Sequence, residues 1–375
     1  MIEKPLKRVI GNRPLSLLRG RIPGIENKMA SRIVFGTVNL HTIPTQDEAF
    51  QLLDVVWASG CNVFDVAAIY GGGQCEQILG DWLSSRKVPK DEVIVITKGG
   101  CEGQDKLWAA TIGDRSAVLA SLESSLKRLQ LKHIDCYLLH RDDPSIPVEY
   151  IVDIMSSLVN SKVVGAWGVS NWSVNRICAA QKYANDAGRI PLSIDSPQFS
   201  LAKPSRPVWP GTTFIDSYKD YDSATKSDIV VLGWECLAKG FRCGKWADAG
   251  VATEADNFEL NEHNGNEWRD AQLRIAYCTE ENFARQKRAI EIAKLKGVEP
   301  AELALGYVLS QSENSFALVG TTKKKHFLES ARAGDKESNV VNMTLSEIRY
   351  LENGVEPEGG LNKFCCVKVR SGYDC

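Results

Sequence analysis

The amino-acid sequence predicts an α/β protein, a (β/α)8 TIM barrel with long loops at the C-terminal face. Two observations support this prediction. Short runs rich in β-branched residues alternate with longer amphipathic runs, and the alternation yields eight strand candidates. Strands that alternate with helices become parallel strands joined by right-handed crossovers, and eight such units close into a barrel rather than an open sheet.

Each predicted strand is a short apolar run of the length that buried parallel strands have. The eight predicted strands are 33–37, 62–66, 93–98, 134–140, 163–169, 192–199, 228–235 and 316–320.

The predicted helices carry an apolar residue every three or four positions, so that one face packs inward. In 116–129 these residues are Val118, Leu119, Leu122, Leu126 and Leu129. The helical patterns include 46–59, 76–85, 116–129, 148–161, 174–187 and 283–296.

A doubly wound open sheet is the weaker alternative. It would require Gly-x-Gly-x-x-Gly after an early strand, whereas Gly71-Gly72-Gly73 follows the second strand without that spacing. These glycines are better explained as a tight turn behind Tyr70.

Three long stretches interrupt the regular pattern, at 99–115, 201–226 and 238–282. Each follows the C-terminal end of a strand, so we expect all three to surround one mouth of the barrel and to select the substrate. Trp108, Trp172 and Trp209 lie in or near them and are candidates for an apolar substrate pocket, although a lone tryptophan often only covers local core.

Composition describes a globular chain with ample core. The 375 residues are 43% hydrophobic and 25% charged, with a formal net charge of −2. The longest basic run is Lys323-Lys324-Lys325, so nucleic acid is not an expected partner. Residues 1–21 mix basic residues with prolines, and no apolar run reaches the ~18 residues needed to span a bilayer, so we expect neither a secretory signal nor a membrane anchor.

The eleven cysteines are scattered and odd in number, which favours reduced thiols and a cytoplasmic location. Cys365, Cys366 and Cys375 form neither a metal-ligand spacing nor a prenylation box and receive no function.

Four polar residues at the C-terminal ends of three predicted strands carry the candidate chemistry: Asp65, Tyr70, Lys98 and His140. A phenol beside a buried lysine has its ionised form favoured, so Tyr70 becomes an acid usable near neutrality. Asp65 can keep the Lys98 ammonium charged. His140 can hold a carbonyl oxygen and, at a pKa of roughly 6.5, donate a proton at mild acidity.

Each of these residues also has an ordinary structural explanation. An Asp at a strand end is often a turn or cap residue, such a Lys often only extends to solvent, and a His in an apolar run is usually a satisfied core side chain. The functional interpretation rests on their coincidence, because a parallel barrel places its chemistry at the C-terminal ends of its strands.

These residues lie in motifs that resemble the aldo-keto reductase family, over about residues 31–354. The motifs are Phe64-Asp65-x-Ala67-x-x-Tyr70-Gly71, Glu76-x-x-Leu79-Gly80, Ile96-Thr97-Lys98, Ser125-Leu126-x-x-Leu129, Ile134-Asp135-x-Tyr137-x-Leu139-His140 and Gly168-Val169-Ser170-Asn171. The resemblance implies a barrel domain at 31–354, an N-terminal extension at 1–30 and a C-terminal tail at 355–375.

The resemblance also implies a function: hydride transfer between a nicotinamide cofactor and an aldehyde or ketone. Tyr70 is then the acid, and Asp65, Lys98 and His140 complete a catalytic tetrad. The implied partner is a small carbonyl or alcohol substrate, and the oligomeric state cannot be read.

The implied cofactor contacts fall in two groups. Ser170, Asn171 and Gln198 would hold the carboxamide and Trp234 would stack on the nicotinamide ring, although by themselves Asn171 suggests a helix cap and Trp234 a core residue. The remaining implied contacts are Thr37, Glu235, Leu237, Gly240, Gly320, Thr321, Thr322, Lys323, His326, Glu329 and Ser330.

The segment from Gly320 to His326 favours NADP(H), because backbone amides at a helix start and nearby basic side chains attract a 2′-phosphate. A solvated lysine run is the alternative. Well-studied reductases carry Lys at Gly320, Arg at His326 and often Asn at Ser330, so NAD(H) stays an alternative.

Two other functions are weighed. Some barrels of this family are redox-responsive sensors or regulatory subunits that keep the tetrad but turn over little. A metal hydrolase would use His140-Arg141-Asp142-Asp143 with His41, but such a site usually needs more histidines, so no metal is expected.

Overall fold

The computed structural model describes residues 15–101, 111–226, 228–243, 250–252, 266–341 and 343–364. Its centre is a closed parallel barrel whose strands neighbour one another in the order β10-β3-β4-β5-β6-β7-β8-β9. The strands are β3 Ile33–Gly36, β4 Val63–Asp65, β5 Ile94–Gly99, β6 Ile134–Leu139, β7 Val164–Ser170, β8 Ile194–Ser196, β9 Val230–Gly233 and β10 Ser315–Gly320. The predicted (β/α)8 barrel is confirmed, with all eight strands near their expected positions.

One strand is much shorter than expected. The predicted strand 192–199 is reduced to β8, Ile194–Ser196. Pro197 follows directly and has no N–H to donate to a neighbouring strand, so beyond it Gln198 makes only isolated bridges, to Phe214 and Trp234.

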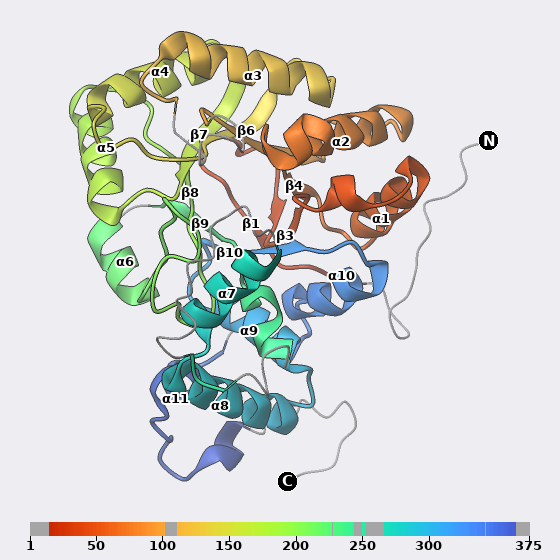
Figure 1. Ribbon diagram of the computed structural model, residues 1–375, viewed down its shortest axis with the longest axis vertical. Coiled ribbons are helices and arrows are strands. Elements are labelled where there is room, and N and C mark those ends of the chain that lie inside the picture. The colour runs from red at the N-terminus through yellow and green to blue at the C-terminus, as the bar shows by residue number, and fades with distance from the viewer. Residues whose placement is uncertain are drawn as a thin grey trace.

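The helices surround the strands (Figure 1). Each helix predicted from its apolar period is present, with ends shifted by up to three residues. The helices are α1 Gln46–Ala58, α2 Gln74–Ser85, α3 Arg115–Leu129, α4 Val148–Asn160, α5 Val174–Asp186, α6 Tyr218–Thr225, α7 Asn266–Tyr277, α8 Glu280–Lys296, α9 Pro300–Leu309, α10 Lys324–Ala331 and α11 Leu345–Asn353.

Two of the three long loops contain a helix. Helix α6 ends the 201–226 stretch, and α7 lies within 238–282. The sequence predicts no regular structure in these stretches. Helix α6 is short and its sequence is largely polar, so its pattern does not reveal it. Its two buried residues, Tyr218 and Tyr221, anchor it. Of the first stretch, 99–115, residues 102–110 lie outside the described residues.

The core has two layers because side chains alternate between the two faces of each strand. Inside the barrel, Val34, Val63, Ile96 and Leu138 belong to one apolar cluster. Side chains such as Phe35 face outward and pack against the helices. This alternation fixes which strand-end side chains reach the mouth of the barrel.

The N-terminal end of the barrel is covered by a short antiparallel hairpin that the sequence did not predict. Its strands are β1, Arg19–Gly20, and β2, Ala30–Ser31. Ile22 and Ile25 from the intervening turn join the apolar cluster inside the barrel. The described part of the 1–30 segment therefore packs onto the barrel.

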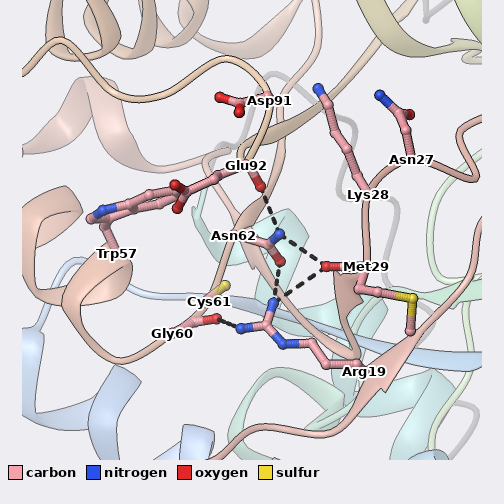
Figure 2. Close-up of a pocket in the computed structure, with 10 residues that line it drawn as sticks. All are labelled: Arg19, Asn27, Lys28, Met29, Trp57, Gly60, Cys61, Asn62, Asp91 and Glu92. Carbon is pink, nitrogen blue, oxygen red and sulfur yellow. Dashed lines mark hydrogen bonds between the residues drawn. The ribbon is translucent and has the colours of Figure 1, made fainter.

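Arg19 and Asn62 fasten this hairpin to the barrel (Figure 2). The Arg19 guanidinium donates to Asn62 Oδ1 at 2.7 Å and to the Gly60 carbonyl at 2.8 Å. The Asn62 amide donates to the carbonyls of Met29 and Glu92, at 3.0 and 2.8 Å. The hydrogen bonds bring together three segments distant in sequence.

No described helix has both the length and the apolar character needed to cross a membrane.

Candidate active site

The four candidate catalytic residues lie on neighbouring elements at one end of the barrel. Asp65 is the last residue of β4, Lys98 is in β5, and His140 directly follows β6. The backbone holds these ends side by side: Ala68 N donates to Lys98 O, and His140 N donates to Gly99 O, both at 2.9 Å. The structure therefore brings the predicted residues together.

Lys98 is the hub of the cluster. Its ammonium lies 2.6 Å from the Asp65 carboxylate and donates to the Tyr70 hydroxyl at 3.1 Å. It also donates to the carbonyl of Val66 at 3.3 Å. Lys98 is 3% exposed and Asp65 is 1% exposed, so the ion pair is almost completely removed from water.

A left-handed glycine turn positions Tyr70. Tyr70 begins the 3-10 helix η2, Tyr70–Gly73. Gly71, Gly72 and Gly73 have φ angles of 58°, 62° and 93°, which glycine adopts without the steric cost of a side chain. The prediction of a tight turn behind Tyr70 is confirmed, and its effect is to hold the phenol over Lys98.

Burial governs the ionisation of the phenol. Burial raises the pKa of Tyr70, the Lys98 ammonium lowers it and the Asp65 carboxylate raises it again, with an upward net shift. The expected net lowering of the Tyr70 pKa is therefore wrong, because sequence alone does not reveal how strongly the phenol is desolvated. The hydroxyl is kept protonated, as a proton donor must be before it reacts.

The ammonium stays charged despite its burial. Burial lowers the pKa of Lys98, but the Asp65 carboxylate and Tyr70 outweigh this effect and raise the pKa overall. Asp65 thus performs the role predicted for it, since an isolated ammonium at this depth would tend to lose its proton.

His140 lies against Tyr70 as a neutral ring. The ring centroids are 5.7 Å apart, at an interplanar angle of 78°. Burial lowers the pKa of His140 well below its ordinary value, and the cations of Lys98 and Arg141 lower it further. The expectation that His140 donates a proton at mild acidity is wrong; it can donate a hydrogen bond as a neutral imidazole.

Arg141 is a second cation near the site, and the sequence argument gave it no role there. It is 8% exposed and directly follows His140. Its charge lowers the pKa of both Tyr70 and His140. Its place beside His140 in the sequence is the signal that would have found it.

Glu76 supports the cluster through Thr97, the residue before Lys98. This fully buried carboxylate accepts a hydrogen bond from Thr97 Oγ1 at 2.6 Å and pairs with Arg128 at 2.6 Å. Glu76 lies in α2, Arg128 in α3, and Thr97 directly precedes Lys98 in β5. The contacts of Glu76 with Thr97 and Arg128 therefore hold β5 against both helices. Gly80 allows this approach, because a Cβ there would lie 2.4 Å from the Arg128 carbonyl.

The predicted carboxamide residues form a connected group beside His140. Asn171 donates to Ser170 Oγ at 2.9 Å and to the His140 carbonyl at 3.3 Å. Ser170 Oγ donates to the Ser196 carbonyl at 2.7 Å. Gln198 Oε1 is buried and has no hydrogen-bond partner among the described residues, so it can accept from an amide.

Glu235 connects the next predicted contacts. Its carboxylate accepts from Gln198 at 3.3 Å, from the Tyr277 hydroxyl at 3.1 Å and from Trp209 Nε1 at 3.3 Å. Trp234 is half-buried and is held by its backbone between Pro197 and Phe199. Helix α7, which carries Tyr277, thus closes onto the segment after β9.

The other predicted cofactor contacts lie on two nearby segments. Thr37 is buried and donates to the Asp65 carbonyl at 3.0 Å. Leu237 is half-buried, and Gly240 has a φ of 92° in a turn that also contains Lys239 at a φ of 50°.

The predicted phosphate-binding segment runs from the end of β10 into α10. Gly320 ends β10, and Thr321 Oγ1 accepts from the Lys323 N–H at 3.1 Å. Lys324 donates to Gln51, and Lys325 pairs with Glu329 at 3.7 Å. Lys323 and His326 are exposed, Thr322 and Glu329 are half-buried, and Ser330 is buried.

The three predicted pocket tryptophans do not share one environment. Trp209 is half-buried and packs on Trp268 of α7 at 5.6 Å between ring centroids. Trp172 is 2% exposed and lines a separate cavity with Asp195 and Tyr221. Trp108 lies outside the described residues.

The residues of the metal-hydrolase alternative are engaged otherwise. Asp142 pairs with Arg176 at 2.8 Å, and Asp143 accepts from Ser145 Oγ at 2.6 Å. Within the described ranges, no group of three or more His, Cys, Asp or Glu side chains could hold a metal ion.

A solved structure of another protein has the same barrel fold. A crystal structure of a thermostable aldo-keto reductase in complex with the inhibitor epalrestat superposes with a TM-score of 0.61 at 17% identity, covering 90% of this chain and 99% of that one. This likeness establishes the barrel fold.

Three curated relatives are similar over most of their length. A probable voltage-gated potassium channel subunit beta from Oryza sativa subsp. japonica is 26% identical, covering 77% of this chain and 82% of the relative. A putative subunit of the same description from Schizosaccharomyces pombe is 25% identical, with 80% and 85% covered. A probable one from Arabidopsis thaliana is 24% identical, with 81% and 87% covered.

Residues 32–350 match the sequence pattern described as the aldo/keto reductase family. This span includes every strand of the closed barrel and the whole Asp65, Tyr70, Lys98 and His140 cluster. The chain belongs to the aldo/keto reductase family.

Proposed function

We propose that this protein is an NADP(H)-dependent oxidoreductase that reduces an aldehyde or ketone to an alcohol, reversibly. The observation that carries the proposal is the position of the buried Lys98 ammonium, 2.6 Å from the Asp65 carboxylate and 3.1 Å from the Tyr70 hydroxyl. A phenol with this neighbour can release a proton when negative charge develops on a nearby oxygen.

The residues fit a nicotinamide cofactor. Gln198 Oε1 is buried without a partner among the described residues and can accept from a carboxamide, while Ser170 and Asn171 stand beside it. When bound, the reduced nicotinamide supplies the hydride that forms the new C–H bond on the carbonyl carbon.

The side chains of Tyr70, Lys98 and His140 orient the carbonyl and transfer the proton. His140, as a neutral ring, donates a hydrogen bond that orients the carbonyl oxygen. As that oxygen gains charge, the Tyr70 O–H bond breaks and its proton forms the alcohol O–H. Lys98 stabilises the phenolate left behind, and the phenolate regains a proton from solvent. Alcohol oxidation runs through the same groups in reverse.

The preference for NADP(H) over NAD(H) rests on the start of α10. The exposed Lys323 precedes the helix and, with backbone amides at its first turn, can attract a 2′-phosphate. Lys323→Ala should weaken NADPH binding about five- to tenfold, roughly the value of one charge-assisted contact, and leave NADH binding unchanged.

Lys325→Ala is the matched control, because Lys325 is 84% exposed and already pairs with Glu329. Fluorescence titration of both cofactors with the wild-type and both variants measures the effect. Equal NADPH and NADH affinities in the wild type would contradict the preference.

A second function is suggested by the names of the three relatives, which describe probable or putative voltage-gated potassium channel beta subunits. In this alternative the protein is a regulatory subunit that binds nicotinamide cofactor and turns over little. The test is to titrate the purified protein with NADPH, then add 4-nitrobenzaldehyde and follow the loss of nicotinamide absorbance. Binding with steady turnover supports the reductase; binding without turnover of a panel of aldehydes and ketones supports the subunit.

A further inference from the structure

Arg141 brings a second cation to the mouth of the barrel. It directly follows His140 at the end of β6 and is 8% exposed. An arginine at a strand end usually extends its guanidinium to solvent. Here Nη1 instead donates to the His140 carbonyl at 3.3 Å, so the guanidinium folds back over the chain beside the catalytic cluster.

The side chain of Arg141 lies between a predicted cofactor contact and a loop expected to select the substrate. The Asn171 amide donates to the same His140 carbonyl, also at 3.3 Å. A Cβ at Gly211 would lie 3.9 Å from Arg141 Cδ, so the arginine stem reaches the 201–226 stretch. Both neighbours belong to the mouth where the carbonyl substrate would enter.

The charge of Arg141 acts on both groups that would hold the carbonyl oxygen. Burial raises the pKa of Tyr70, and Arg141 is among the cations that lower it. For His140, burial, Lys98 and Arg141 all lower the pKa. Burial lowers the pKa of Arg141 itself, whereas Cys101 and Tyr70 raise it. The guanidinium is therefore within electrostatic range of the reacting centre and of Cys101, which follows β5.

A guanidinium in this position favours anions. Charges interact more strongly beside low-dielectric walls than in water, and a cleft that carries one sign of charge concentrates the other. The planar guanidinium also matches the oxygen geometry of carboxylates and phosphates. Lys98 is less suited to this role, because its ammonium already lies 2.6 Å from the Asp65 carboxylate.

We propose that Arg141 makes the site select aldehydes and ketones that carry an oxyanion, either a carboxylate or a phosphate, over neutral ones of similar shape. Arg141 attracts and orients the oxyanion, while Tyr70 and His140 hold the carbonyl oxygen. This substrate class rests on the proposed reductase function and narrows it.

The test compares matched substrates at saturating NADPH. Two pairs are 3- and 4-carboxybenzaldehyde with their methyl esters, and a third is glyceraldehyde 3-phosphate with glyceraldehyde. In at least one pair kcat/KM should be at least about tenfold higher for the anion, which is the order of one charge-assisted contact. The pair that shows the preference distinguishes carboxylate from phosphate.

Two variants and a control assign the preference to Arg141. In Arg141→Gln the anion preference should be lost, whereas Arg141→Lys keeps a positive charge and should retain part of it. Arg32→Gln is the matched control, since Arg32 is 5% exposed and donates to a backbone carbonyl, that of Ser315, at 3.1 Å. Arg32 precedes β3 and Ser315 begins β10, so this contact lies at the opposite end of the barrel, and the control should keep the wild-type preference.

The outcomes separate the substrate class from the reductase function. Turnover of the neutral members without a preference for the anion in any pair would overturn the substrate class and leave the reductase function standing. No turnover of any member would contradict the reductase function and the substrate class with it. An anion preference that survives Arg141→Gln, disappears in Arg141→Lys or disappears in Arg32→Gln would overturn the role of Arg141.

Discussion

Asp65 and Asp195 are both 1% exposed and both lie among the last two residues of a barrel strand, yet they face opposite sides of the sheet. Asp65 faces the mouth of the barrel and has the Lys98 ammonium 2.6 Å away. Asp195 faces the helices and has the Tyr221 hydroxyl at 2.9 Å. Burial raises the pKa of each, but only Asp65 has a cation that opposes the rise. Burial is the largest cause of the raised pKa in both carboxyls, so the comparison teaches that, at equal depth, the partner sets how much of the cost of burying the charge is offset.

The largest expected effect comes from removing the cation. Lys98→Met leaves Asp65 buried and unpaired, which should lower the free energy of unfolding by about 3–5 kcal/mol. In the proposed mechanism Lys98 stabilises the Tyr70 phenolate, so kcat/KM for aldehyde reduction should also fall on the order of 10³-fold. Denaturant unfolding and steady-state kinetics measure the two effects.

Lys28→Met is the matched control for this variant. Lys28 also pairs with a buried carboxylate, Asp135, with both side chains about 10% exposed or less. The Lys28→Met variant should lose stability while kcat/KM stays close to the wild-type value, because the Lys28–Asp135 ion pair lies outside the proposed catalytic cluster. If both variants lost turnover equally, the effect of Lys98→Met would be structural.

The next largest effect concerns Asp195, the buried carboxyl that has a tyrosine hydroxyl and no cation as its partner. The pKa of Asp195 is about 7 in the folded protein and about 3.9 unfolded, so the folded state holds the proton more tightly. Stability from this group is therefore complete below pH ~4 and is lost as pH rises through 7, by on the order of a few kcal/mol.

Asp195→Asn cannot ionise and should escape this loss. The difference in unfolding free energy, wild type minus variant, should become more negative between pH 5 and pH 8 in denaturant titrations. A difference that stays constant over this range would mean that Asp195 is not the desolvated carboxyl described here.

The smallest expected effect is that His140, at the mouth of the barrel, does not titrate near neutral pH. Burial, Lys98 and Arg141 together lower the pKa of His140 well below its ordinary value, so the ring should stay neutral from pH 8 down to pH 5.5. The His140 Cε1 signal in carbon-detected NMR, assigned by its loss in His140→Gln, should not shift over this range. In Lys98→Met the His140 pKa should rise, since one of the two cations is gone; an unchanged value would contradict the assigned cause.

The sequence was sufficient for the features that repeat or that lie at strand ends. The eight strands follow from β-branched runs, and Asp65, Lys98 and His140 meet because the C-terminal ends of parallel strands meet. Three features depended on tertiary packing: the hairpin under the barrel, the Glu76–Arg128 pair, and helices α6 and α7. The direction of the Tyr70 pKa shift also could not be read, because it depends on how completely the phenol is buried.

The central claim is that Tyr70 is the proton donor for carbonyl reduction, and Tyr70→Phe tests it most directly. The measurement is NADPH oxidation with an aldehyde that the wild type reduces, together with the NADPH Kd from fluorescence quenching. The account predicts that turnover falls by at least about 100-fold while the Kd changes less than twofold, since the substitution deletes the acid and leaves the cofactor contacts intact. Wild-type turnover in the Tyr70→Phe variant would contradict it.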